Sequence, residues 1–148
     1  MGKLLFGVDA PIVVPVTVDL LVGGKPHQIK FEAEFKRISR SLAIKEQKRL
    51  NKLVREFRKA SAAAANNPDD DAAQDRADAA ADEINQFNDR LIRKRLIGWS
   101  GLTGADGDEL SYSEEALEEM LDHLAYFEAL RDAMALATGK VIEDAEKN

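Results

Sequence analysis

Two runs of alternating apolar and polar residues flank Gly23 and Gly24, and they constrain the fold more than any other feature. In the first run, apolar residues alternate with Pro15, Thr17 and Asp19; the second run repeats the pattern with apolar Ile29, Phe31, Ala33 and Phe35. This period of two, interrupted by a Gly-Gly pair, predicts an amphipathic β-hairpin within residues 1–37. A lone hairpin is marginally stable in water, so its apolar face needs a covering helix or its edges need another chain.

The spacing of apolar residues becomes helical from about Leu42 onwards. Two helical stretches are separated by Asn66-Asn67-Pro68, and Asp69 to Asp71 supply capping and first-turn acids for the second. We therefore predict an antiparallel helical hairpin over residues 41–96. The Ala- and Asp-rich part, residues 62–81, leaves a flexible linker as the alternative.

The C-terminal third begins with an irregular region. We predict a connection over 97–112, which contains four glycines within a ten-residue span. Ser113 followed by two glutamates is typical of a helix start. Two C-terminal helices are predicted over 113–139, ending at Thr138-Gly139, with a polar tail over 140–148. The expected fold is a single α+β domain, residues 1–148 and mostly helical, with the β-hairpin packed on the helical hairpin.

Charge is distributed unevenly along a chain whose formal net charge is −6. Residues 36–59 carry ten Lys or Arg against two Glu, a balance of +8, whereas residues 101–148 carry thirteen Asp or Glu against three Lys or Arg, a balance of −10. This asymmetry favours a homo-oligomer joined by complementary charge and by hairpin edges. The acidic end argues against a general nucleic-acid binder, although the basic helix leaves a small DNA-binding regulator as an alternative.

Residues that carry catalysis or bind metals are scarce. The chain has no cysteine, no phosphate-binding glycine loop, and only two histidines, His27 and His123, far apart in the sequence. The segment from Asp106 to Glu109 lacks the acid spacing of a calcium loop. Ile12 to Val22 is too short and too polar to cross a membrane. We therefore expect no enzyme activity, no cofactor, no metal site and no membrane contact, and a protein that acts by binding proteins.

Trp99 is the only tryptophan, and it lies in the glycine-rich connection. Its side chain either docks the connection on the core or anchors a protein interface, where Trp contributes disproportionate binding energy. Leu110 and Tyr112 are placed to close over the same patch, ahead of the helical Leu117 and Leu121. These five residues form the predicted partner-binding site.

The stretches 96–102, 105–110 and 112–117 resemble tail assembly chaperones of long-tailed, siphophage-type bacteriophages. The shared pattern is a Trp, a small turn, Asp-Gly, an apolar residue, an aromatic-Ser pair and a helix of the Glu-x-x-Leu kind, here within Leu96 to Leu117. The resemblance implies a non-enzymatic protein of the host cytoplasm, absent from the mature virion. Its implied partners are the tape measure protein, which it keeps soluble, and the tail tube protein, which it helps to recruit. A structural tail completion or adaptor protein is the alternative.

Overall fold

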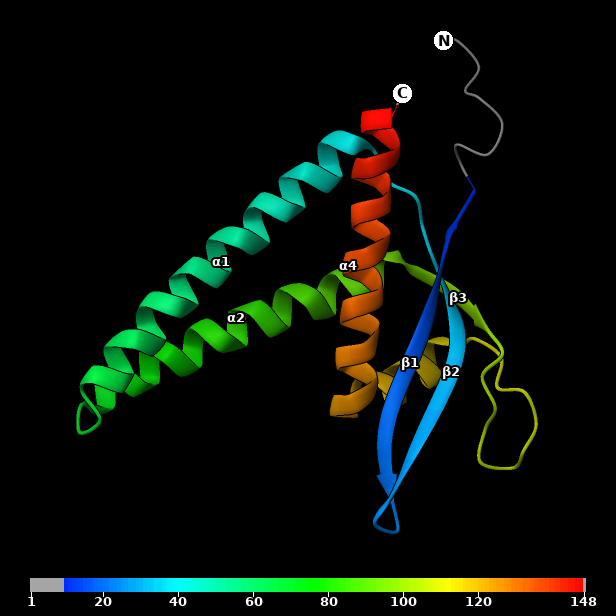
Figure 1. Cartoon of the computed structure of the whole chain (residues 1–148), viewed down its shortest axis with the longest axis horizontal. Coiled ribbons are helices and arrows are strands. Elements are labelled where there is room, and N and C mark those ends of the chain that lie inside the picture. Colours follow the sequence, from blue (N-terminus) through cyan, green and yellow to red (C-terminus); the bar gives the residue numbers. More distant parts are fainter. Residues whose placement is uncertain (1–9, 148) are drawn as a thin grey trace.

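The computed structural model describes residues 10–147 and consists of a small sheet, a covering helix and a projecting helical hairpin (Figure 1). The predicted α+β, mostly helical class is confirmed. The first nine residues of the predicted hairpin region lie outside the described residues. The elements in chain order are β1 (Ile12–Val22), β2 (Lys25–Phe35), α1 (Arg40–Asn66), α2 (Asp71–Arg95), β3 (Leu96–Ser100), α3 (Glu114–Leu121) and α4 (Leu124–Lys147).

The β1–β2 hairpin forms in the predicted register around its glycine turn. Val14 lies opposite Ala33 and Val16 opposite Phe31, so the apolar residues of both strands share one face. Gly23 and Gly24 have φ values of 58° and 79°, the left-handed conformations that a tight two-residue hairpin turn requires. The Gly-Gly pair is therefore what permits this register.

The sheet has a third strand that the sequence did not predict. β3 pairs with β2 in antiparallel fashion, giving the order β1-β2-β3, with Trp99 opposite Ala33 and Gly98 opposite Glu34. The prediction of an irregular connection over 97–112 is wrong for its first four residues. Five residues are too few for a clear period of two, and the outward-facing residue between Leu96 and Gly98 is an apolar isoleucine.

Helix α4 covers the apolar face of the sheet. Val14, Val18 and Phe35 from the strands share one core with Leu130 and Met134 from α4. The β-hairpin was predicted to pack on the helical hairpin. This prediction is wrong, because α4 has the most extensive contacts with the sheet. The base of the helical hairpin joins this core through small or aliphatic residues such as Ala43 and Ile92.

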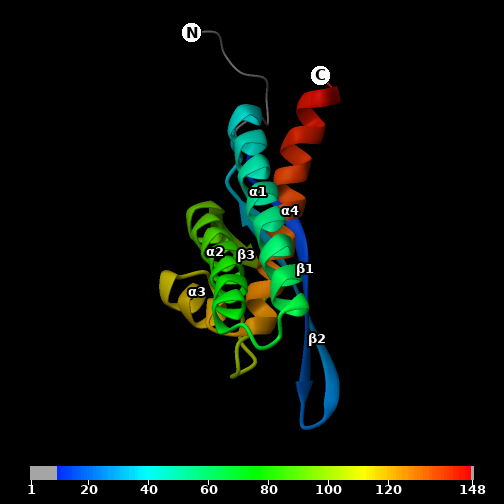
Figure 2. The same cartoon turned by 90° about the vertical axis from the view of Figure 1, so that its left-hand side faces the viewer.

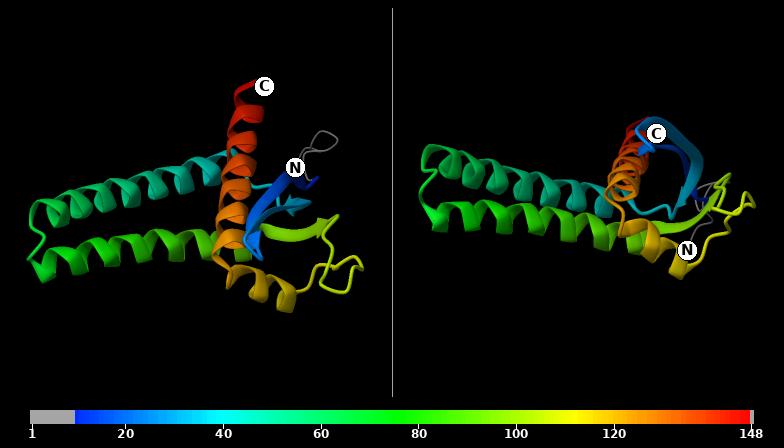
Figure 3. Two further views of the ribbon diagram at one scale, coloured as in Figure 1. Left: turned by 60° about the horizontal axis from the view of Figure 1, so that its bottom comes forward. Right: turned by 90° about the horizontal axis from the view of Figure 1, so that it is seen from below.

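Helices α1 and α2, residues 40–95, form the predicted helical hairpin, which we call the arm. The views in Figure 3 show it extending away from the body formed by the sheet, α3 and α4. Asp70 caps α2 by accepting a hydrogen bond from the Ala73 amide at 3.2 Å, and Gln74 Nε2 donates to the Ala64 carbonyl at 2.8 Å. Residues 62–81 are thus helical on both sides of a short turn, and the flexible-linker alternative is wrong.

Both ends of the arm return to the same place in the sheet. The Lys36 amide, just after β2, donates to the carbonyl of Arg95, just before β3, at 2.7 Å. The Arg95 guanidinium donates to Glu46 of α1, and this ion pair lies in the base of the arm with side chains only 8% and 15% exposed. The arm is therefore clamped where it leaves the body.

Helix α4 is longer than predicted. It runs through Thr138 and Gly139 to Lys147, so both the predicted helix end at residue 139 and the predicted polar tail are wrong up to residue 147. Gly139 is not among the glycines with positive φ, and the burial of Ala137 and Val141 continues the helical stripe across it. None of the helices within residues 10–147 is long and apolar enough to cross a membrane.

Candidate partner-binding site

Trp99 joins the strand, the connection and α3 into one unit. Its side chain is 7% exposed and lies on the inner face of the sheet, where its ring meets Phe31 edge-on at 6.4 Å between centroids. On the other side, Tyr112 packs against it at 4.9 Å with an interplanar angle of 77°. The indole Nε1–H donates to the Leu110 carbonyl at 2.8 Å, which satisfies the one polar atom of a buried ring.

The glycine-rich connection is an ordered loop closed by its own backbone. The Leu110 amide donates to the Leu102 carbonyl at 2.7 Å, and the Gly104 amide donates to the Asp108 carbonyl at 2.8 Å. Gly107, with φ 86°, makes the turn between these two segments. The loop ends at Ser113, whose hydroxyl accepts from the Ala116 amide at 3.0 Å and caps α3 as predicted.

The structure divides the five predicted site residues into buried and accessible ones. Trp99 and Leu117 belong to the core, at 7% and 5% exposed, so the docking role of Trp99 is the one its position supports. Tyr112 and Leu121 are half-buried, while Leu110 is 38% exposed. Trp99 contacts both Leu110 and Tyr112. Leu121 lies apart from them, on a different hollow.

That hollow is a groove between α2 and the start of α4, with a volume of about 650 Å³. Its apolar lining comes from Leu121 at the end of α3 and from Leu124 and Phe127 in α4. Leu124 is 72% exposed, the second most exposed large apolar side chain among the described residues. The remaining lining residues are polar or charged: Asn85, Gln86, Asp89, Arg90, Asp122, Glu128 and Arg131. We call this hollow the α2–α4 groove.

A second hollow, of about 330 Å³, lies between the loop and α3, and Leu110 is one of the residues that line it. Met120 and Tyr126 add apolar surface, and Glu119 and His123 are its titratable neighbours. Burial raises the pKa of the Tyr126 phenol above its ordinary value. The His123 and Tyr126 rings lie 6.3 Å apart, edge to face. This hollow presents apolar surface beside a carboxylate, without a nucleophile and base held together.

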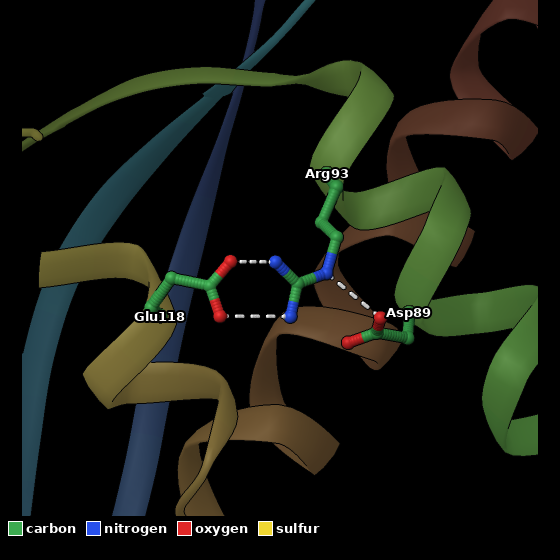
Figure 4. A network of polar contacts seen from close by, with 3 residues as sticks. All are labelled: Asp89, Arg93 and Glu118. Carbon is green, nitrogen blue, oxygen red and sulfur yellow. Dashed lines mark hydrogen bonds and ion pairs between the residues drawn. The ribbon is translucent and has the colours of Figure 1, made fainter. Parts of the chain in front are cut away.

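An ion cluster links α3 to α2, as Figure 2 shows for the helices and Figure 4 for the side chains. Arg93 Nε donates to Asp89 at 2.8 Å, and the two terminal nitrogens of Arg93 bind both carboxylate oxygens of Glu118. The guanidinium lowers the pKa of Glu118, mainly through these hydrogen bonds, and the two carboxylates raise the pKa of Arg93. Asp89 also lines the α2–α4 groove, so the cluster forms one of its walls.

Sequence reasoning missed Leu124 and Phe127 as site residues. Leu124 continues the spacing of Leu117 and Leu121, and such spacing is typical of a single buried stripe on one helix. In the structure α3 ends at Leu121, and Leu124 begins α4 with a different face directed inward. The helix boundary at Asp122-His123, which no Pro or Gly marks, is what turns Leu124 outward.

Neither hollow contains an evident metal centre, and across the described residues no three or more His, Cys, Asp or Glu side chains are grouped so as to hold a metal ion. The α2–α4 groove offers an apolar floor between charged walls, a chemistry suited to one face of an amphipathic helix. Comparison of the chain with protein-family models, with curated proteins and with solved structures finds no match.

Proposed function

We propose that the chain is a non-enzymatic assembly chaperone of a long-tailed bacteriophage, which binds the tape measure protein and helps to recruit tail tube protein around it. It acts in the host cytoplasm and leaves before the virion is complete. The proposal is based on the structural unit that residues 96–117 form. Four positions of the family-like pattern have a structural role there: Trp99, Gly107, Tyr112 and Ser113.

Each of these residues contributes at a different point along the segment. Trp99 is the buried plug, Gly107 provides the turn after Asp106, and Leu110 offers its carbonyl to the indole. Tyr112 packs on the Trp99 ring, and Ser113 caps the helix that follows. Together these residues hold the start of α3 against the sheet, so the segment that carries the family-like pattern is a defined structural unit.

The α2–α4 groove supplies the binding surface in this proposal. A tape measure protein is a long helical chain whose exposed apolar faces promote aggregation, and covering one such face keeps it soluble. Leu124 and Phe127 would cover it, and burying the 72% of Leu124 that is exposed contributes up to about 1.5–2 kcal/mol, or roughly tenfold or more in affinity. Several weak contacts of this size along a long partner permit release during assembly.

The test is co-expression with the tape measure protein of the phage that encodes this chain. Soluble tape measure protein should increase and co-purify with the chain, and Leu124→Glu should reduce the capture at least tenfold. Leu136→Glu is the matched control, since Leu136 lies on the same helix, is 57% exposed and does not line the groove. Equal capture by Leu124→Glu and wild type would contradict the assigned surface.

Purified virions separate the chaperone from a structural tail component. Mass spectrometry of the virions should detect the tape measure protein without this chain. Its presence in stoichiometric amount would replace the chaperone proposal with the structural one. A salt-dependent shift of DNA mobility, without tape measure capture, would instead favour a DNA-binding regulator.

A further inference from the structure

The two outer faces of the arm carry opposite charge. On α1, cations recur at steps of three and four residues and form the basic stripe: Lys45, Lys48, Lys52, Arg55 and Lys59. On α2, carboxylates recur at the same steps and form the acidic stripe: Asp71, Asp75, Asp78 and Asp82. Steps of three and four keep each set on one side of its helix.

Both stripes point away from the seam in which α1 and α2 pack together. Lys45 and Arg55 each lie two residues after a buried residue of α1, Ala43 or Leu53, and two residues correspond to about 200° around a helix. Asp75 stands in the same relation to the buried Ala73 of α2. The basic and acidic stripes therefore face opposite sides of the arm.

None of these nine side chains forms an ion pair within the described part of the chain. All nine residues are exposed, and the ion pairs of the arm involve other residues, Glu46 with Arg95 and Asp89 with Arg93. Ala72 and Ala79 lie beside the acidic stripe, where their small side chains permit close approach of another helix. Two complementary surfaces thus remain open on a single element.

We propose that the occupant of each stripe is a second copy of this chain, with the basic stripe of one arm against the acidic stripe of the next. A two-fold dimer of these faces would set basic stripe on basic stripe or acidic on acidic, which like-charge repulsion opposes. The contact is therefore heterologous, and each added copy leaves one stripe of each sign free. Arms associate side by side into an open array or a closed ring.

This contact is weak and sensitive to salt. Exposed ion pairs each contribute little, and screening shortens the reach of charge from about 10 Å at 0.1 M to about 3 Å at 1 M ionic strength. Assembly of this kind needs a high local concentration of the chain. The inference does not rest on the proposed chaperone role, and its test uses the purified chain alone.

Sedimentation velocity of charge-reversed variants tests the contact. At low salt, wild type should sediment as concentration-dependent oligomers that dissociate at about 1 M salt. Lys48→Glu/Lys52→Glu and Asp78→Lys/Asp82→Lys should each be monomeric, while an equimolar mixture of the two should assemble again. The chain that carries all four changes should assemble by itself.

Lys25→Glu/Lys30→Glu is the matched control, because it reverses two exposed cations on the hairpin and should leave assembly unchanged. Circular dichroism melts establish that each variant is folded. A wild-type chain that stays monomeric at all salts overturns the proposal, and so do oligomers that survive either double reversal.

Cysteine cross-linking then distinguishes the heterologous contact from a two-fold one, and the absence of native cysteine makes it unambiguous. Lys52→Cys and Asp78→Cys should each give little cross-linked dimer alone and abundant dimer when mixed. Efficient cross-linking of either variant with itself would overturn the proposal in favour of a two-fold interface.

Discussion

At the scale of single residues, Trp99 performs three tasks with one side chain: it fills the inner face of the sheet, supports Tyr112 and donates to the loop carbonyl of Leu110. A substitution at Trp99 should therefore change the stability of the fold. Its influence on partner binding is indirect, because the ring itself is buried and the loop that it orders carries the exposed Leu110.

Trp99→Ala should therefore lower the free energy of unfolding by about 3–5 kcal/mol, the usual cost of truncating a buried aromatic residue. Trp99→Phe retains a ring and loses the hydrogen bond, so it should cost less, about 1–2 kcal/mol. Urea denaturation followed by circular dichroism measures both. A Trp99→Ala chain as stable as wild type would mean that the ring is not part of the core.

The Glu46–Arg95 pair supplies a second residue-scale prediction. Glu46→Gln leaves the Arg95 charge in the base of the arm without its counterion, which should cost about 3–5 kcal/mol. The double change Glu46→Gln/Arg95→Met removes the orphaned charge and should recover much of that loss. The second carboxylate oxygen, Oε1 of Glu46, is buried without a hydrogen-bond partner, so the pair is not ideally satisfied in any case.

A double-mutant cycle by chemical denaturation measures this coupling. If the two single changes and the double change prove additive, the pair contributes no interaction to stability and the clamp at the base of the arm relies on backbone contacts alone.

At the scale of elements, the contact between α2 and α3 includes the Glu118 carboxylate, whose pKa is lowered by Arg93. A lowered pKa means that Glu118 stabilises the folded state above its ordinary value of 4.5, and that this contribution disappears as pH falls through the folded-state pKa. Glu118→Gln should thus have a lower melting temperature than wild type at pH 7, and this difference in melting temperature should disappear as the pH falls toward 3.

Thermal melts of both proteins between pH 7 and pH 3 test this expectation. Glu119→Gln is the control on the next residue, since Glu119 makes no ion pair with any described residue. A gap that persists unchanged at pH 3 would exclude the Glu118 charge as its cause.

The elements also show what sequence patterns can and cannot predict. The hairpin and the arm were predictable because period-two and helical spacing extend over eleven residues or more in each. Strand β3 was not, because its pairing depends on β2, more than sixty residues earlier in the chain. Gly139 predicted a helix end, but α4 continues past it because Val141 is buried in the tertiary structure.

The candidate site was predictable only in part, for the same reason. Trp99, Leu110 and Tyr112 were singled out correctly as neighbours, since they lie close in sequence. The α2–α4 groove was not predicted, because it is formed by helices whose contact no local pattern encodes.

At the scale of the whole molecule, the arm and the body differ in how much apolar side chain they bury. The outer half of the arm packs through small residues, Ala60, Ala64, Ala73, Ala77 and Ala80. The body has a core of valine, phenylalanine and leucine. Stability should accordingly be highest in the sheet and decline toward the arm tip.

Hydrogen exchange read by mass spectrometry should show this gradient. Amides in peptides covering residues 60–80 should exchange well before those of β1 and β2, with the base of the arm near Ile92 in between. Equal protection of the tip and the sheet would mean that the arm gains stability from contacts beyond its own seam, such as neighbouring copies.

The hydrogen bond from Lys36 to Arg95 has a consequence for how this fold tolerates change in length. Because the arm departs from β2 and returns to β3 at adjacent points, paired helical turns inserted or deleted near its tip leave the strand register untouched. Each pair of matched turns would alter its reach by about 5.4 Å. The arm is thus a spacer whose length evolution or design can adjust independently of the body that carries it.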